Sequence, residues 1–141
     1  MTTKPKNMLY HEVHFHHADS EWLLFIHGAG GSTVTWKRQV AELQHRYNLL
    51  VVDLPGHGKM ANKSSDSRTY SFEGIAKKLW AVVKHHQIRR VHLVGVSLGT
   101  VIALTMRELK PQRVASLING GAILRLTPGL KLLASASLLL A

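Results

Sequence analysis

A serine held between two glycines is the first feature of this chain that could carry out chemistry. Gly95, Ser97 and Gly99 form a G-x-S-x-G pattern that follows an apolar, β-branched run and leads directly into a helix-forming run. Glycine has no Cβ, so the chain can reverse tightly here while neighbouring elements lie close by. The middle residue is then pushed to the tip of the turn in a strained conformation, with its hydroxyl exposed. The spacing therefore predicts a nucleophilic serine at position 97.

A backbone amide beside this serine supplies a second chemical group. The amide of Leu98 opens the expected helix and lacks an intrahelical partner. It points to the place where negative charge collects on a carbonyl oxygen under attack by the serine. Glycines are also common at ordinary strand-to-helix turns, where a serine between them has no chemical role. The remainder of the chain decides between these two interpretations.

The elements that position the serine alternate between strands and helices. Alternating apolar and polar residues predict one edge strand, and continuous apolar runs predict strands that are buried on both faces. The predicted strands cover residues 8–16, 22–26, 48–53, 91–96 and 114–119. Strands and helices that alternate at this spacing are typical of an α/β fold with a mostly parallel sheet and helices on both faces.

Three segments between these strands are predicted to be helices. The first begins after the Ser-Thr pair at 32–33 and carries its apolar side chains on one face. The second, over residues 72–83, also has a single apolar face. The third, over residues 101–109, is apolar nearly all round, which predicts a central and buried helix. Residues 122–141 are apolar with a Pro-Gly break, and we expect them to begin a lid or cap segment.

Composition limits the class of protein. The chain has 141 residues, which is one domain at most, and it has no cysteine, which excludes disulfides and thiol catalysis. Lysine and arginine number 18 against 8 acidic residues, a formal net charge of +10, but the basic residues are scattered and no nucleic-acid motif accompanies them. No signal peptide or membrane span is evident. We therefore expect a cytoplasmic protein that binds neither nucleic acid nor membrane.

Two other patterns suggest a metal site and a dinucleotide site, but each lacks a required residue. His14 and His16 share a strand face and form a potential metal pair, but no third ligand is fixed by spacing, so we expect a solvated histidine-rich edge and no metal. The G-A-G run at 28–30 follows a strand, as a dinucleotide fingerprint would. The third glycine of that fingerprint is replaced by Thr33. We therefore expect no cofactor.

Three motifs together resemble the α/β-hydrolase superfamily, and they appear in the order of that family. H-G-A-G stands at 27–30, D-L-P-G-H-G at 53–58 and G-V-S-L-G at 95–99, each at the end of a predicted strand. The resemblance covers nearly the whole chain but only the N-terminal part of the family's fold. It therefore implies that residues 1–141 are the N-terminal part of a single α/β-hydrolase domain, ending after the strand that follows the nucleophile helix.

The resemblance also implies roles for individual residues. Ser97 matches the nucleophile, and the amides of Leu98 and Ala29 match the oxyanion donors. His27 and Gly28 match the supporting turn. The family mechanism is attack of the serine on the carbonyl of an ester, lactone, thioester or similar small-molecule acyl substrate, followed by hydrolysis of the acyl-enzyme. We expect the side chains of His27, His57 and Asp53 to hold loops together rather than to act on substrate.

The catalytic partners of Ser97 depart from the family pattern. The family places an acid and then a histidine after the nucleophile, whereas no His and no Asp follow Ser97 here and Glu108 is the single acid. We expect these 141 residues to be a fragment or a truncated product, inactive alone. The strand over 114–119 would then be an open edge at which copies could associate. The alternative is a non-catalytic module that retained the fold to bind a ligand or a partner.

Overall fold

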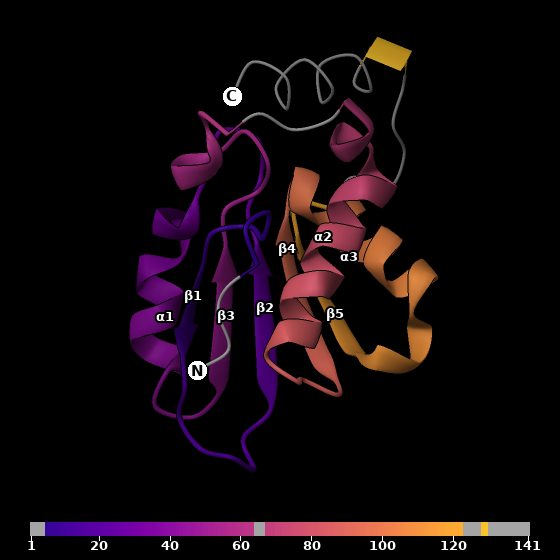
Figure 1. Cartoon of the computed structure of the whole chain (residues 1–141). Coiled ribbons are helices and arrows are strands. Elements are labelled where there is room, and N and C mark those ends of the chain that lie inside the picture. Colours follow the sequence, from indigo (N-terminus) through magenta and orange to yellow (C-terminus); the bar gives the residue numbers. More distant parts are fainter. Residues whose placement is uncertain (1–4, 64–66, 123–127, 130–141) are drawn as a thin grey trace.

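A computed structural model describes residues 5–63, 67–122 and 128–129 of the chain. Five strands form one sheet in the order β1-β3-β2-β4-β5, with helices on both faces (Figure 1). The elements in chain order are β1 (His11–His14), β2 (Trp22–Ile26), η1 (Thr33–Trp36), α1 (Lys37–Leu43), β3 (Asn48–Val52), η2 (Gly58–Met60), η3 (Ser67–Tyr70), α2 (Phe72–His85), β4 (Val91–Val96), α3 (Leu98–Leu109), η4 (Pro111–Arg113) and β5 (Val114–Gly120). The predicted α/β class is confirmed.

Four of the five strands are parallel, and this brings the three motifs to one edge of the sheet. β2 pairs in parallel with β3 and β4, and β5 pairs in parallel with β4, whereas β1 is antiparallel to β3. The carboxyl ends of β2, β3 and β4 therefore meet at one edge, where ligands bind in open α/β sheets. The turns at 27–30, 53–58 and 95–99 follow these three strands.

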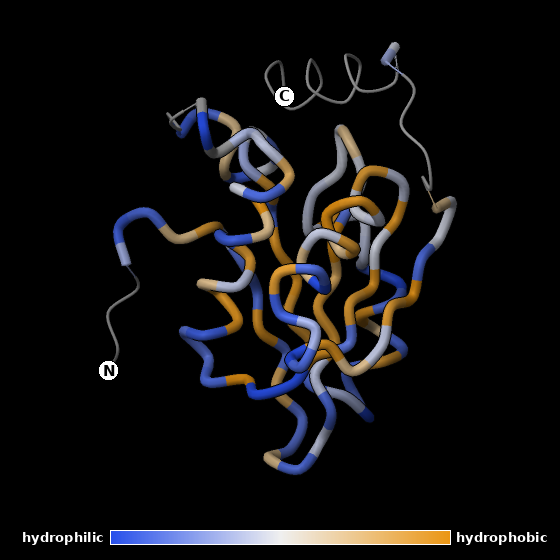
Figure 2. Tube along the Cα trace, turned by 90° about the vertical axis from the view of Figure 1, so that its right-hand side faces the viewer, coloured by the Kyte–Doolittle hydropathy of each residue, from blue (hydrophilic) through white to orange (hydrophobic). Residues whose placement is uncertain are grey.

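The core lies in two layers because side chains alternate across the sheet. Leu24 and Ile26 of β2 face the layer under α2 and α3. Leu23 and Phe25 face the other layer, where they pack with Trp36 beneath α1. Figure 2 shows the hydrophobic segments running through the inner strands and helices, with hydrophilic segments in the outer loops. β2 and β3 are buried on both faces, as their continuous apolar runs predict, whereas alternate residues of β4 are only partly buried.

The layer under α1 is only partly covered. The Ser32 hydroxyl accepts a hydrogen bond from the Val34 amide at 3.2 Å and caps the helical segment, as predicted. That segment begins as η1 and continues as α1 for only 7 residues. Beyond α1, Val94 is half-buried and Ile118 of β5 is 51% exposed. A cavity of about 330 Å³ lies over this part of the sheet.

The prediction of a fully buried third helix is only half right. Leu98, Ile102 and Met106 of α3 are buried, but Leu109 is 38% exposed. Within the described residues, α3 packs against the sheet, α2 and η4. These elements cover one side of the helix, so its apolar residues on the other side remain partly accessible.

The predicted edge strand over 8–16 is too long. β1 covers 4 residues, His11–His14. The Asn48 side chain explains where it ends, because its Oδ1 accepts hydrogen bonds from the amides of His16 at 2.7 Å and His17 at 3.1 Å. These amides are thereby turned away from the strand ladder.

The opposite edge is formed by β5, as predicted for the last strand. β5 is 7 residues long and contains no charged residue and no proline. Its outer edge pairs with no strand in the described part of the chain. The predicted lid or cap segment over 122–141 lies almost entirely outside the described residues. None of the helices in the described ranges combines the length and apolarity needed to cross a membrane.

Candidate active site

Ser97 occupies the junction between β4 and α3 in a backbone conformation that L residues rarely adopt. Its φ is 49° and its ψ is −117°. A left-handed φ at a non-glycine residue costs roughly 1–2 kcal/mol and persists only where the surroundings enforce it. The side chain is exposed at the carboxyl edge of the sheet. The strained, exposed tip that the G-x-S-x-G pattern predicts is therefore present.

Two glycines allow the helix and the strands to approach closely around this turn. A Cβ at Gly95 would lie 2.6 Å from the carbonyl oxygen of Gly99. A Cβ at Gly99 would collide with the carbonyl oxygen of Ile26 at the end of β2. Each glycine therefore fills a place where only a hydrogen atom fits. Their spacing in the sequence reflects direct packing of α3 onto β2 and β4.

Hydrogen bonds to the backbone of Ser97 fix the turn further. Its amide donates to the carbonyl of Gly120 in β5 at 3.0 Å. Its carbonyl accepts from the Thr100 amide at 2.9 Å and from the Thr100 hydroxyl at 2.7 Å. Sequence reasoning did not identify Thr100 or Gly120. The one available sequence signal is the threonine three residues after the serine, because a threonine hydroxyl in the first turn of a helix can donate a hydrogen bond to the carbonyl that begins that turn.

The turn after β2 lies directly against Ser97. A Cβ built on Gly28 would be 3.2 Å from the Ser97 Cβ and 3.8 Å from its Oγ. Glycine at this position therefore leaves the space next to the hydroxyl open. Neither the Ala29 amide nor the Leu98 amide donates a hydrogen bond to another group within the described residues. The resemblance assigns both of these amides to an oxyanion hole.

His27 is built into the scaffold of the site. It is fully buried, its Nδ1–H donates to the Gly28 carbonyl at 2.7 Å, and its Nε2 accepts from the Leu54 amide at 3.0 Å. Burial lowers the pKa of His27 to about 4, and the positive form is further disfavoured by His57. The ring is therefore neutral near pH 7 with both nitrogens engaged. It joins the turn after β2 to the loop after β3 and cannot serve Ser97 as a base.

Asp53 joins the same two loops through its carboxylate. Oδ1 accepts from the Thr33 amide at 2.7 Å, and Oδ2 accepts from the Lys59 amide at 2.9 Å. The side chain is buried, so these two charge-assisted hydrogen bonds compensate for its lost hydration. Thr33 opens η1 just beyond the turn at 27–30. The carboxylate therefore holds that turn in position from behind.

His57 is the second buried histidine at this edge. Its Nδ1–H donates to the Pro55 carbonyl at 3.0 Å, and its ring centre lies 5.0 Å from that of His27. Its Nε2 has no hydrogen-bond partner among the described residues. His57 and His27 thus pack together beneath the loops, in agreement with the expectation that they stabilise them.

Within the described residues, no side chain that follows Ser97 is placed to act as its general base or acid. No His or Asp follows Ser97 in the sequence. Glu108 is exposed in the last turn of α3, roughly 16 Å along the helix from Ser97 at a rise of about 1.5 Å per residue. It therefore cannot orient a base beside the serine hydroxyl.

The histidine-rich edge shows no metal-binding arrangement. His14 lies 3.8 Å from a carboxylate oxygen of Glu12, and the amide of His16 is bound to Asn48. Among the residues that the structure describes, no three His, Cys, Asp or Glu side chains are arranged to hold a metal ion.

Comparison with known families identifies the fold. The model of the alpha/beta hydrolase fold family matches residues 21–136. The chain belongs to the α/β-hydrolase family. The match includes β2 through β5, so it contains the turn after β2, the Asp53 loop and the Ser97 junction described above.

Relatives in the α/β-hydrolase family carry different activities in their names. The chain is 33% identical over 89 residues to the magnesium-chelatase 30 kDa subunit of Rhodobacter capsulatus, covering 63% of this chain and 31% of that protein. It is 33% identical over 115 residues to the putative carbamate hydrolase RutD of Pseudomonas savastanoi pv. phaseolicola, covering 79% and 43%. A crystal structure of the N-acyl homoserine lactonase AidH, complexed with N-butanoyl homoserine, superposes with a TM-score of 0.67 at 29% identity, covering 79% and 40%.

These three proteins are longer than the chain. The 141 residues span 31% to 43% of their lengths. Their names include hydrolases and a chelatase subunit, so the shared fold does not by itself specify one reaction.

Proposed function

We propose that Ser97 is the nucleophile of an acyl hydrolase that acts on an ester, lactone, thioester or similar bond. The observation that carries this proposal is the conformation of Ser97: an exposed serine with φ of 49° at a strand-to-helix junction. A strained nucleophile on such a turn presents its hydroxyl to substrate above the sheet. The hydrolase and lactonase names among the relatives support the same class of reaction.

The proposed reaction proceeds through an acyl-enzyme. Ser97 Oγ forms a bond to the carbonyl carbon of the substrate, and the carbonyl oxygen becomes an oxyanion held by the amides of Ala29 and Leu98. Collapse of this intermediate breaks the acyl bond, and the leaving group departs with the proton that the serine lost. Water then attacks the acyl-enzyme and releases the acid, restoring the serine hydroxyl. The product is a carboxylic acid plus an alcohol, or the equivalent thiol or ring-opened hydroxy acid.

Turnover by the 141 residues alone is expected to be slow. An unassisted serine hydroxyl is a weak nucleophile, and activation requires an adjacent base. Both nitrogens of His27 are engaged, and no His follows Ser97. Oxyanion donors and binding without the triad leave a rate on the order of 10³-fold over water. We infer that full activity requires a base that these residues do not supply.

Covalent labelling tests the proposal at the level of one residue. A fluorophosphonate probe followed by peptide mass spectrometry is expected to modify Ser97 faster than Ser71, an exposed serine whose hydroxyl bonds only to backbone groups and which serves as an internal reference. Ser97→Ala should abolish this labelling, whereas Ser71→Ala should leave it unchanged. Equal labelling of the two serines would contradict the proposal, because it would show no activation by the turn.

The second candidate function is a ligand-binding or interaction module without catalysis. The name of one relative, a magnesium-chelatase subunit, favours it because that name specifies no acyl hydrolysis. In that case Ser97→Ala should bind a small acyl ligand such as N-butanoyl homoserine lactone as well as the unchanged protein does, and neither should hydrolyse it. A fall in hydrolysis with retained binding would instead support the acyl hydrolase.

A further inference from the structure

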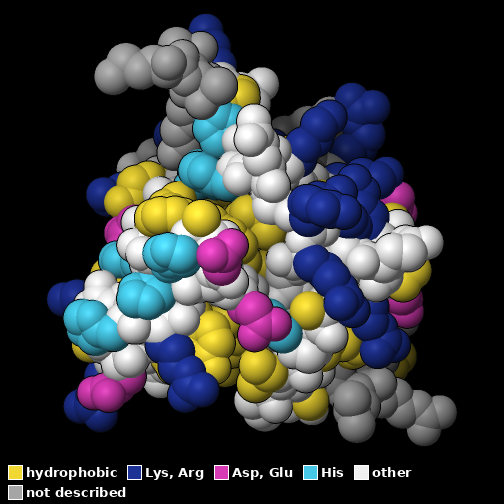
Figure 3. All heavy atoms as spheres, turned by 90° about the horizontal axis from the view of Figure 1, so that it is seen from below, with side chains coloured by type: hydrophobic (Ala, Val, Ile, Leu, Met, Phe, Trp, Pro, Cys, Tyr) yellow, Lys and Arg dark blue, Asp and Glu magenta, His cyan; other side chains and the backbone are white. Residues whose placement is uncertain are grey.

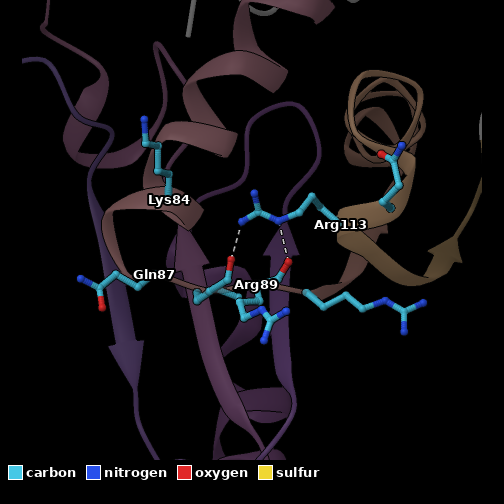
Figure 4. A pocket seen from close by; sticks show the side chains of 7 residues that line it. Lys84, Gln87, Arg89 and Arg113 are labelled. Carbon is cyan, nitrogen blue, oxygen red and sulfur yellow. Dashed lines mark hydrogen bonds between the residues drawn. The ribbon is translucent and has the colours of Figure 1, made fainter.

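A cavity of about 610 Å³ lies at the opposite end of the sheet from Ser97, where β4 begins. It is formed by the end of α2, the connection to β4 and the short helix η4 (Figure 4). The residues that line it are Lys84, Gln87, Ile88, Arg89, Arg90, Gln112 and Arg113. Its volume falls within the range of about 300–1,000 Å³ that is usual for small-molecule sites.

The wall of this cavity is rigidly constructed. α2 ends in a turn at Gln87, whose φ is 56°, and the Ile88 amide closes the turn by donating to the Val83 carbonyl at 3.2 Å. Arg113 reaches across from η4, and its guanidinium donates to the Ile88 carbonyl at 2.6 Å and to the Arg89 carbonyl at 2.5 Å (Figure 4). Arg113 therefore holds the connection between α2 and β4 at two of its carbonyls.

Every charged side chain that lines the cavity is a cation. Lys84, Arg89 and Arg90 are exposed, and Arg113 is half-buried. None of the four forms an ion pair with a carboxylate within the described residues. Seen from below, Lys and Arg side chains gather in a band on one side of the molecule (Figure 3). The carbonyl end of the α2 dipole is equivalent to roughly half a negative charge, so it offsets only part of this positive charge.

Acidic residues lie on a neighbouring surface and are partly engaged. Asp19 and Glu21 line an adjoining cavity of about 380 Å³, which shares four lining residues with this one, Gln87, Ile88, Arg89 and Arg90. Glu21 contacts His92 at 3.1 Å, and Asp19 lies 3.7 Å from His17. Neither carboxylate forms an ion pair with Arg89 or Arg90 in the described structure, so both guanidinium groups can bind an anion that enters from the α2 and η4 side.

We propose that this cavity binds a phosphate-bearing small molecule. Guanidinium groups match the geometry of phosphate oxygens through paired N–H donors, and lysine adds a point charge. Arg113 is already fixed by the two carbonyls, so it loses little conformational freedom on binding. The six residues of β4 separate the cavity from Ser97 by roughly 20 Å, at about 3.3 Å per residue. The site is thus distinct from the acyl site.

Binding of inorganic pyrophosphate, measured by titration calorimetry at low salt, tests the proposal. The double variant Arg89→Gln, Arg90→Gln should bind about tenfold more weakly or worse, because it removes two charged hydrogen-bond donors. The matched control is Lys37→Gln, Arg38→Gln, which removes an equally exposed adjacent pair of charges from α1. This control and Ser97→Ala should bind like the unchanged protein.

The other outcomes would overturn the proposal. Equal weakening by the two double variants would show that pyrophosphate responds only to the net charge of the chain. If the unchanged protein shows no saturable binding of pyrophosphate in the millimolar range, the cavity is not a phosphate site. Sedimentation with phosphatidylglycerol vesicles, without binding of pyrophosphate, would show instead that the cations recognise a lipid surface.

Discussion

The two ends of β4 are built in different ways. At its carboxyl end, the shape of the Ser97 turn is set by backbone groups and by glycines that leave no room for a side chain. At its amino end, the cavity is defined by long cationic side chains around one clamped connection. The first end depends on geometry that few substitutions tolerate. The second end depends on charges, most of which can be removed without disturbing the fold.

Substitution of Gly99 by alanine is the most severe test of this difference. The new Cβ would collide with the Ile26 carbonyl, and both groups belong to packed secondary structure that cannot yield. We expect a loss of about 3 kcal/mol or more in the free energy of unfolding, measured in urea. Gly121→Ala is the matched control, since its φ is 59° but open space surrounds it, and it should cost about 1 kcal/mol. Equal losses would show that packing at Gly99 is unimportant.

Acid should lower the free energy of unfolding through His27, which lies at the carboxyl end of β2. Burial holds the pKa of this imidazole at about 4, whereas the unfolded chain binds the proton near 6.5. The associated stability is therefore complete above pH 6.5 and is lost as the pH falls from 6.5 to about 4, a change of about 3 kcal/mol. Urea unfolding at several pH values should show a flatter profile for His27→Gln. The exposed His45→Gln should retain the steep profile, and a steep profile in both variants would assign the effect to other groups.

Removal of the Asp53 charge should loosen the loops behind the turn at 27–30. Asp53→Asn replaces one acceptor oxygen by an NH₂ group that faces a backbone amide, at Thr33 or Lys59. We expect a loss of about 2 kcal/mol in unfolding free energy and slower labelling of Ser97 by fluorophosphonate. Asp19→Asn, at an exposed carboxylate, is the control and should change neither quantity. Unchanged labelling of Ser97 in Asp53→Asn would show that the loops held by Asp53 do not affect the reactivity of Ser97.

The smallest expected effects lie at the amino end, and they divide its cations into two kinds. Arg113→Met removes the clamp on the carbonyls of Ile88 and Arg89, so unfolding free energy should fall by about 1 kcal/mol. Arg89→Gln should change it by less than about 0.5 kcal/mol, since its side chain is exposed. Denaturant titration of the two variants measures the difference. Identical stabilities would mean that Arg113 has no structural role.

Much of the fold follows from the sequence because it depends on local patterns. Continuous apolar runs identified the buried strands, and the Ser97 pattern identified the strained turn. The predicted length of β1 was wrong, and so was the prediction that α3 is buried nearly all round. In both cases groups distant in sequence decide the outcome: Asn48 ends β1, and α2 and β2 lie on only one side of α3.

Less of the candidate site could be predicted, for the same reason. The motifs named Ser97, Gly28 and Asp53, but hydrogen bonds over long sequence separations hold the loops that carry these residues. The Asp53 carboxylate reaches Thr33, 20 residues earlier, and Arg113 reaches Ile88, 25 residues earlier. No periodicity encodes such contacts. The left-handed turn at Gln87 was likewise invisible, because a glutamine carries no signal for a positive φ.

The hydrogen bond from the Ser97 amide to the Gly120 carbonyl ties the Ser97 turn to β5, the edge strand of the sheet in the described residues. Edge strands fray more readily than central ones, because only one of their sides is paired. Each brief opening of β5 therefore releases one constraint on the Ser97 backbone and lets it relax from its strained φ. Pairing of a further strand with β5 would suppress such openings, so the strained conformation of Ser97 is thermodynamically linked to the pairing of this edge.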